Sequence, residues 1–268
     1  MLRSLYSGIT SLRTHQVRMD VVANNIANVN TTAFKSARAN FQDVLAQTIG
    51  RTAINTTQVG LGVGLAAIDN VFTQGALQTT GRVLDLAIEG NGFFVVKPVD
   101  SNGNTIDNPM YTRDGTFYLD KDGYLVNAQG YRVQKSGNGD IRFTTVTPDK
   151  IATISIGTDG KIVATATDGT TETYTIGLVT FNNVESLQRV GSNLWDVTPR
   201  VTQPDPATPG DPGTGGRGII RSGYLEMSNV DLAQEFTTMI TTQRGYQANA
   251  RIITTSDELL QELVNLKR

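Results

Sequence analysis

The sequence predicts an α+β protein, with a helix at each end of the chain and a central antiparallel all-β body. Near both termini, apolar residues recur at alternating spacings of four and three, which is typical of a helix with a heptad seam. The middle of the chain instead contains short runs rich in β-branched and aromatic residues. Turns such as KDGY at 121 and TDGK at 158 separate these runs, as expected for antiparallel strands.

The N-terminal helix is expected within residues 1–33. Its seam has Gln16 and Ala23 at two positions and larger apolar residues at the others, namely Leu5, Ile9, Leu12, Met19 and Ile26. Asparagine competes for backbone hydrogen bonds and is a weak helix former. The cluster of Asn24, Asn25, Asn28 and Asn30 therefore predicts that the helix ends here and that the chain turns away.

The C-terminal helix is expected within residues 228–268. Ser228 followed by Asp231 resembles a capping box, which predicts a helix start near residue 229. Gln243, Ala250 and Asp257 interrupt the seam. Its larger apolar members are Leu232, Phe236, Met239, Tyr246, Ile253, Leu260 and Val264. Two long helices with narrow seams exceed what one globular body needs, so we expect these residues to mediate self-assembly into a homopolymer.

Three segments are expected between the helices. Residues 34–70 have little periodic signal and predict an extended arm, with one helical turn around FQDVLAQTI. Residues 71–200 form the predicted β body, whose strand candidates are GFFVV, GTFYL, GYLV, YRVQ, ATISIG, KIVATA, TYTIGLVTF and NLWDV. Residues 201–227 begin with a stretch rich in proline and glycine, which predicts a loop. The rest of this range is expected to be a return segment, which leads the chain back to the C-terminal helix.

Composition excludes several classes of function. The 268 residues include 23 basic and 25 acidic side chains, so no excess of positive charge indicates nucleic-acid binding. The absence of cysteine excludes disulfides and thiolate metal sites. No apolar run reaches membrane-spanning length, and the first residues do not resemble a secretory signal peptide. Composition alone therefore predicts a cytoplasmic protein without membrane insertion.

No motif predicts a catalytic, cofactor or metal site. His15 is the only histidine and lies beside the helix seam, where partners for a triad or a metal site are not apparent. DKDGYL at 120 lacks most ligands of a calcium loop, and GLGVGL at 60 lacks the βαβ context of a phosphate loop. We therefore predict a protein that is not an enzyme. The alternative is a β-domain enzyme or carbohydrate-binding module on a helical stalk, suggested by the aromatic hairpins and Trp195.

The stretch ANNIANVNTTAFK resembles the N-terminal signature of the axial proteins of the bacterial flagellum, the rod and hook proteins. The matching residues are Asn24, Asn25, Ala27, Asn28, Thr31, Phe34 and Lys35. Three further blocks are similar to the same family, namely TGRVLDLAIEGNGFFVV, YTRDGTFYLDKDGYLVNAQGYRV and the segment from SGYLEMSNVDL to the end. Position 33 departs from the signature: it is alanine where the family often has glycine, and alanine disfavours a left-handed turn.

The resemblance implies a hollow tube in which the terminal helices line the channel and the β body lies outside. It also implies export without a cleaved signal through the flagellar type III apparatus, to a location outside the cell in the hook or basal body. The closing LVNLKR and the short GRTAINTT segment favour the hook, a flexible coupling that transmits motor torque; the alternative is the distal rod. The implied partners are further copies, the distal rod protein, the hook cap, the hook–filament junction proteins and the export apparatus.

Overall fold

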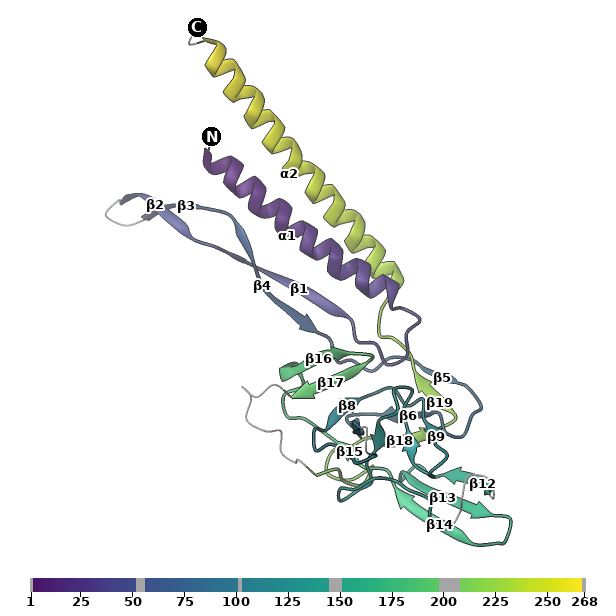
Figure 1. The fold of residues 1–268 in the computed structure, drawn as a ribbon. Helices are drawn as coiled ribbons and strands as arrows, with labels where there is room; N and C mark the ends of the chain where they lie inside the picture. The colour runs from purple at the N-terminus through teal and green to yellow at the C-terminus, as the bar shows by residue number, and fades with distance from the viewer. Residues whose placement is uncertain (1, 52–55, 101–102, 145–150, 198–207, 267–268) are drawn as a thin grey trace. The chain divides into compact units, whose positions relative to one another are not determined.

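The computed structural model describes residues 2–51, 56–100, 103–144, 151–197 and 208–266. The chain divides into two compact units. The helical unit comprises Met1–Val29, Lys35–Val71 and Val230–Arg268, and the β unit comprises Asn30–Phe34 and Phe72–Asn229. The predicted α+β class is confirmed, with a helix near each terminus and antiparallel strands between them (Figure 1).

Two antiparallel helices form the core of the helical unit, α1 (Leu2–Ala27) and α2 (Leu232–Leu266), and the chain termini lie toward the same end of the pair (Figure 1). The expectation that α2 starts near residue 229 is wrong, because Asp231 rather than Ser228 caps this helix. Asp231 Oδ1 accepts hydrogen bonds from the backbone N–H of Ala233 at 2.9 Å and of Gln234 at 3.3 Å. These are the helix donors that would otherwise have no partner.

The contact between α1 and α2 includes small and polar residues that lie outside the predicted heptad seam. Asn249 Nδ2 donates to Ser11 Oγ at 2.6 Å. A Cβ added to Gly245 would lie 2.9 Å from His15 Cε1, so only glycine leaves room for the imidazole ring. Ser11 and His15 each precede a seam position by one residue. A coiled coil along the seam is therefore not confirmed.

The arm of the helical unit consists of two antiparallel strand pairs, β1 (Ala37–Asp43) with β4 (Val63–Asn70) and β2 (Ala46–Arg51) with β3 (Thr56–Gly60). The helical turn expected around FQDVLAQTI is wrong. The backbone groups of this stretch bond across the arm instead, as in the bond from Leu61 N to Leu45 O of 2.8 Å. Such pairing is non-local, so local propensity did not reveal it.

The β unit is built from short strands. They are β5 (Leu77–Thr79), β6 (Leu86–Glu89), β7 (Phe93–Lys97), β8 (Met110–Thr112), β9 (Tyr118–Leu119), β10 (Leu125–Val126), β11 (Arg132–Val133), β12 (Ile151–Ile156), β13 (Lys161–Ala166), β14 (Thr171–Thr175), β15 (Leu178–Val179), β16 (Leu187–Gly191), β17 (Leu194–Val197), β18 (Ile219–Ser222) and β19 (Tyr224–Glu226). A 3₁₀ helix, η2 (Val184–Ser186), precedes β16. All pairings between these strands are antiparallel.

The largest sheet has the strand order β16-β17-β8-β7-β11-β10-β9, and β15 also pairs with β7. Strands β12, β13 and β14 form a second sheet. The main core includes Phe94, Phe117 and Ile220, whose rings and side chains are fully buried. A smaller cluster surrounds Phe93 and Trp195. Because Trp195 is only 2% exposed, it does not support the alternative of a carbohydrate-binding module.

The return segment is part of the β unit. Strand β18 pairs with β6, and β19 pairs with β5, so this segment closes two strand pairs before the chain enters α2. The proline-rich stretch that precedes it falls partly on residues 198–207, which lie outside the described residues.

Candidate self-assembly surface and signature loop

Asn25 connects three elements of the helical unit. Its side chain is 1% exposed. Its Nδ2 donates to the carbonyl of Ala37 at 2.9 Å and to Glu235 Oε1 at 3.0 Å, and its Oδ1 accepts from Ala37 N at 3.0 Å. One amide therefore joins the end of α1, the start of β1 and the first turn of α2. An amide suits this position because it donates and accepts at once.

Asn24 and Asn28 lie at the end of α1. Asn28 Nδ2 donates to the carbonyl oxygen of Asn24 at 2.9 Å and to its Oδ1 at the same distance. The backbone N–H of Asn28 also bonds to the Asn24 carbonyl. These bonds satisfy a carbonyl group of the last helical turn, where the regular ladder stops. Ala27, the last residue of α1, is exposed.

The signature loop (residues 30–34) has a left-handed backbone at Ala33, where φ is 55°. The left-handed turn that alanine at this position had put in doubt is present, and the surrounding contacts hold the residue in it. Ala33 N donates to the carbonyl of Glu226 at 2.7 Å, and Asn193 Nδ2 donates to the carbonyl of Thr32 at 2.9 Å. Thr31 precedes this turn, and its carbonyl accepts from Phe34 N at 3.4 Å.

Phe34 anchors the signature loop within the β unit. Its ring is buried, and the Arg189 guanidinium lies 4.6 Å from the ring centroid. The same guanidinium lies 5.0 Å from the Trp195 ring, so it is held between two aromatic side chains. Burial lowers the pKa of Arg189. Lys35, the last signature residue, is also almost completely buried.

Many predicted self-assembly residues remain accessible in a single copy. Phe236 is 50% exposed and Val264 is 64% exposed, and Ile9, Leu232 and Tyr246 are also exposed. The others are half-buried, namely Leu5, Leu12, Met19, Ile26, Met239, Ile253 and Leu260. Ile253 packs on α1, because a Cβ added at Gly8 would lie 3.2 Å from its Cγ1. The seam thus includes Ile253, which packs on α1, and several residues that face solvent.

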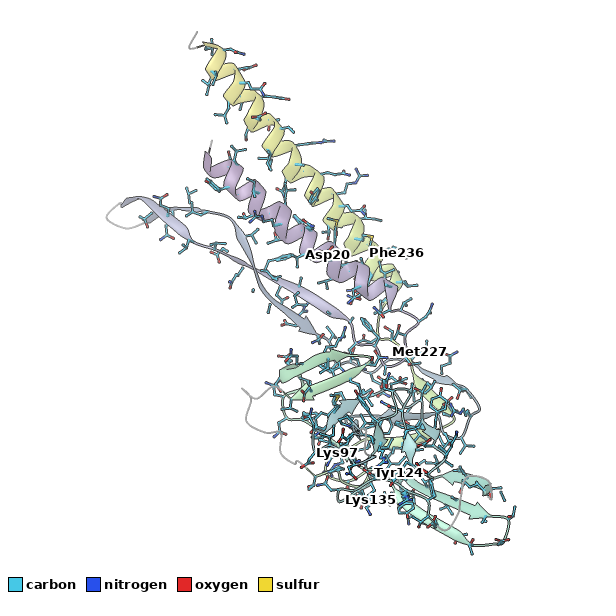
Figure 2. All side chains as sticks on the ribbon, in the orientation of Figure 1. Asp20, Lys97, Tyr124, Lys135, Met227 and Phe236 are labelled. Atoms are coloured by element: carbon cyan, nitrogen blue, oxygen red, sulfur yellow. The ribbon has the colours of Figure 1, made fainter. Side chains whose placement is uncertain are left out.

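Further exposed apolar residues were not predicted from the seam. On α2 these are Ile240, Ile252, Leu259, Leu263 and Leu266. By contrast, the buried residues of this 35-residue helix are Thr242 and Ser256. Figure 2 shows side chains projecting from α2 along its length, with Phe236 labelled near its start. A count of apolar residues on every face, rather than along one seam, would have indicated this surface.

His15 is a titratable group at the contact between the two helices. Its Nδ1 is buried, and the described part of the chain supplies no hydrogen-bond partner for that atom. Burial lowers the pKa of the imidazole, and the nearby charge of Arg18 lowers it further. The ring packs against Gly245 in the helix pair, where its charged form is disfavoured.

The described residues contain no cluster of three or more His, Cys, Asp or Glu side chains that could hold a metal ion. Within the same residues, no helix is both long and apolar enough to cross a membrane.

Three family models match the chain. They are described as flagella basal body rod protein over residues 5–35, flagellar hook protein FlgE/F/G D1 domain over residues 87–164, and flagellar basal body rod FlgEFG protein C-terminal over residues 221–266. The flagellar basal-body rod protein FlgG of Bacillus subtilis is 47% identical over 277 residues, covering 100% of both chains. The chain belongs to the flagellar rod and hook protein family.

Two relatives from Borreliella burgdorferi allow rod and hook to be compared within one organism. The rod protein FlgG is 38% identical over 280 residues, and the hook protein FlgE is 30% identical over 451 residues; each comparison covers 100% of both chains. The second alignment is far longer than the 268 residues of this chain. Membership of the rod and hook family makes the chain a structural protein of the flagellum and not an enzyme, and the comparisons favour the rod alternative over the hook.

Proposed function

We propose that this chain is a subunit of the flagellar basal-body rod and that it polymerises with copies of itself into a hollow tube. The observation that carries the proposal is the inverted pattern of α2, which buries Thr242 and Ser256 and exposes Phe236, Leu263 and Leu266. Exposed apolar area of this extent is unfavourable in water, at about 25 cal/mol per Å². Contact with neighbouring copies would remove it from solvent.

The rod is preferred to the hook because of length. The alignment with the Bacillus subtilis rod protein spans 277 positions, close to the 268 residues of this chain. The alignment with the Borreliella burgdorferi hook protein spans 451 positions, so it contains long gaps in this chain. The closing LVNLKR and the short GRTAINTT segment were expected to favour the hook, but the similarity to the rod proteins supports the opposite choice.

The remaining partners follow from this position. The chain is also similar to a hook protein of the same family. This similarity supports contacts between one end of the rod polymer and hook subunits, whose sequence is related to that of the rod subunit. The hook cap and the hook–filament junction proteins, which were expected for a hook subunit, would not contact a rod subunit directly. We retain the type III export apparatus as the route to the basal body.

Imaging of basal bodies tests the proposal. A strain lacking this chain should form basal bodies with a shortened rod and no hook, and expression of the wild-type chain should restore both. A rod of full length that lacks only the hook would instead assign the chain to the hook. As a second readout, an epitope inserted at residue 168 in the exposed β13–β14 turn should label the rod region in the complemented strain.

A further inference from the structure

The hairpin of β16 and β17 contacts the signature loop through its turn. The turn consists of Ser192 and Asn193, with φ of 53° and 59°. A two-residue hairpin turn requires positive φ at both positions, and asparagine adopts it readily. The side chain of Asn193 is used outside the hairpin, because its Nδ2 donates to the carbonyl of Thr32 at 2.9 Å. The Thr112 hydroxyl donates to the carbonyl of Asn193 at 2.9 Å and so holds the turn against the end of β8.

Arg189 on β16 makes the second contact between this hairpin and the signature loop. Its guanidinium lies 4.6 Å from the ring centroid of Phe34 and 5.0 Å from that of Trp195. A guanidinium is planar and is attracted to aromatic faces. Arg189 therefore links a ring of the signature loop to a ring of β17, two segments that are distant in sequence.

A cation is not the residue that stability alone would favour between these rings. Arg189 is half-buried, and burial lowers its pKa, so its charge is partly removed from water. An uncharged side chain of similar length would fill the same space, and a buried charge is rarely a source of stability. What the guanidinium adds is attraction to both rings, which fixes where Phe34 lies relative to Trp195.

The hairpin lies at one edge of the largest sheet. Within the described residues, β16 pairs only with β17. The main core of the β unit, with Phe94 and Phe117 at its centre, is built from other strands and loops. Changes to the polar atoms of the hairpin should therefore alter how the signature loop is held without unfolding the β unit.

The position of the signature loop matters because the loop connects two assembly elements. Helix α1 ends at Ala27 and strand β1 begins at Ala37, so both are continuous with residues 30–34. The loop also bonds to the return segment that leads to α2, since Ala33 N donates to the carbonyl of Glu226 at 2.7 Å. The segments that lead to α1, to the arm and to α2 thus all depend on how this loop is held.

We propose that the hairpin β16–β17 is a clamp for the signature loop and that Arg189 is its positioning residue, which holds residues 30–34 in the arrangement that polymerisation requires. The inference rests on the proposed function, because assembly is the activity that the clamp serves. Arg189 acts through Phe34 and does not need to touch a second copy.

The variant Arg189→Met, which keeps the length of the side chain but not its charge, tests the clamp. Hydrogen exchange of the Ala33 amide should be at least about tenfold faster in this variant, because its bond forms only when the loop is held. The emission of Trp195, the only tryptophan, should shift as the guanidinium leaves its ring. Arg142→Met is the matched control, since that exposed guanidinium lies 5.0 Å from the Tyr124 ring centroid, and it should change neither signal. Unchanged Ala33 exchange in Arg189→Met would overturn the proposal.

A second pair of variants removes the other contact of the clamp. Asn193→Gly tolerates positive φ and deletes the amide that bonds to the carbonyl of Thr32, so exchange of the Ala33 amide should again accelerate. Asn138→Gly makes the same change at an exposed turn with φ of 68°, which has no bond to the signature loop among the described residues, and should have no such effect. Equal Ala33 exchange in these two variants would contradict the clamp.

Polymerisation of the same full-length chains measures the consequence for assembly. Arg189→Met and Asn193→Gly should each need at least about a tenfold higher concentration to polymerise than wild type, whereas the two control variants should match wild type. All four should retain the circular dichroism of the folded β unit. Normal polymerisation of a variant with accelerated Ala33 exchange would overturn the proposed role in assembly. If the wild-type chain stays monomeric, the proposed function is wrong, and the exchange measurements still decide whether the hairpin holds the loop.

Discussion

At the scale of single residues, the signature loop depends on side chains placed where the backbone is least regular. The Asn25 side chain bonds to both the N–H and the carbonyl of Ala37 and also to the Glu235 carboxylate. One amide therefore supplies hydrogen-bond partners at a place where no helix or strand supplies them. Ala33 adopts a conformation that alanine rarely does, at φ 55°. Its cost, about 1–2 kcal/mol for an L-residue, is offset by the contacts of the neighbouring loop residues.

Substitution of Ala33 measures this cost. Ala33→Val should lower the free energy of unfolding by about 2 kcal/mol or more, because a β-branched side chain is strained at positive φ and the site is buried. Ala33→Gly should remain within about 1 kcal/mol of wild type, since relief of strain opposes the greater freedom of glycine in the unfolded chain. Urea unfolding of the full chain compares the two, and equal stability of both variants would show that φ at position 33 does not determine the loop's stability.

At the scale of elements, the two helices contact each other in part through small and polar residues. His15 rests against Gly245, and Ser11 bonds to Asn249. Such a contact allows close approach of the helices but buries little apolar area, so the stability of the pair is sensitive to any charge introduced there.

Acidification should therefore loosen the helix pair. Burial lowers the pKa of His15 below its ordinary value of 6.5, so the unfolded chain binds a proton more readily than the folded one. The stability contributed by the neutral ring is complete above pH 6.5 and is lost as the pH falls through the folded pKa. After correction for the intrinsic exchange rate at each pH, amide exchange in α1 and α2 should accelerate between pH 7 and about pH 5, the range in which histidine is the side chain that ordinarily titrates.

The variant His15→Gln is the matched control for this effect. His15 is the only histidine in the chain, so its replacement should abolish the pH dependence of helix protection in this range. Glutamine is a good helix former and retains hydrogen-bonding groups without titrating. If the variant shows the same acceleration as wild type, the acid sensitivity arises from another group.

The elements also show how far the sequence could predict this structure. Both helices and the antiparallel body were predicted, because 3.6-residue and two-residue periods are local signals. The start of α2 was misplaced because the choice of cap between Ser228 and Asp231 depends on the turn that precedes the helix. The arm strands were not predicted because residues 34–70 have little periodic signal. The face joining the helices was missed because Gly245 and Ser11 carry no apolar signal.

At the scale of the whole molecule, the distribution of apolar residues distinguishes folding from assembly. Ile253 packs against Gly8 within one chain, whereas Phe236 lies on the same helix with half of its surface exposed. The heptad pattern of the sequence includes both residues. Their different surroundings predict different defects when each is replaced by the same charged residue.

Phe236→Asp should leave the fold intact and prevent polymerisation. An exposed residue contributes little to the stability of a single copy, so the free energy of unfolding should change by no more than about 0.5 kcal/mol. Ile253→Asp should instead loosen the helix pair, because the carboxylate would lose water against α1, at a cost of about 1–3 kcal/mol for a half-buried site. Circular dichroism measures the folding of both variants, and sedimentation with electron microscopy measures their assembly.

Tubes formed by the Phe236→Asp chain would refute a role for this face of α2 in the contact between copies. Unchanged helix stability in Ile253→Asp would show that the contact with Gly8 does not hold the pair together. Because each copy in a polymer repeats the same contact, a moderate defect at Phe236 recurs at every step of growth and should abolish assembly at concentrations where the subunit remains folded.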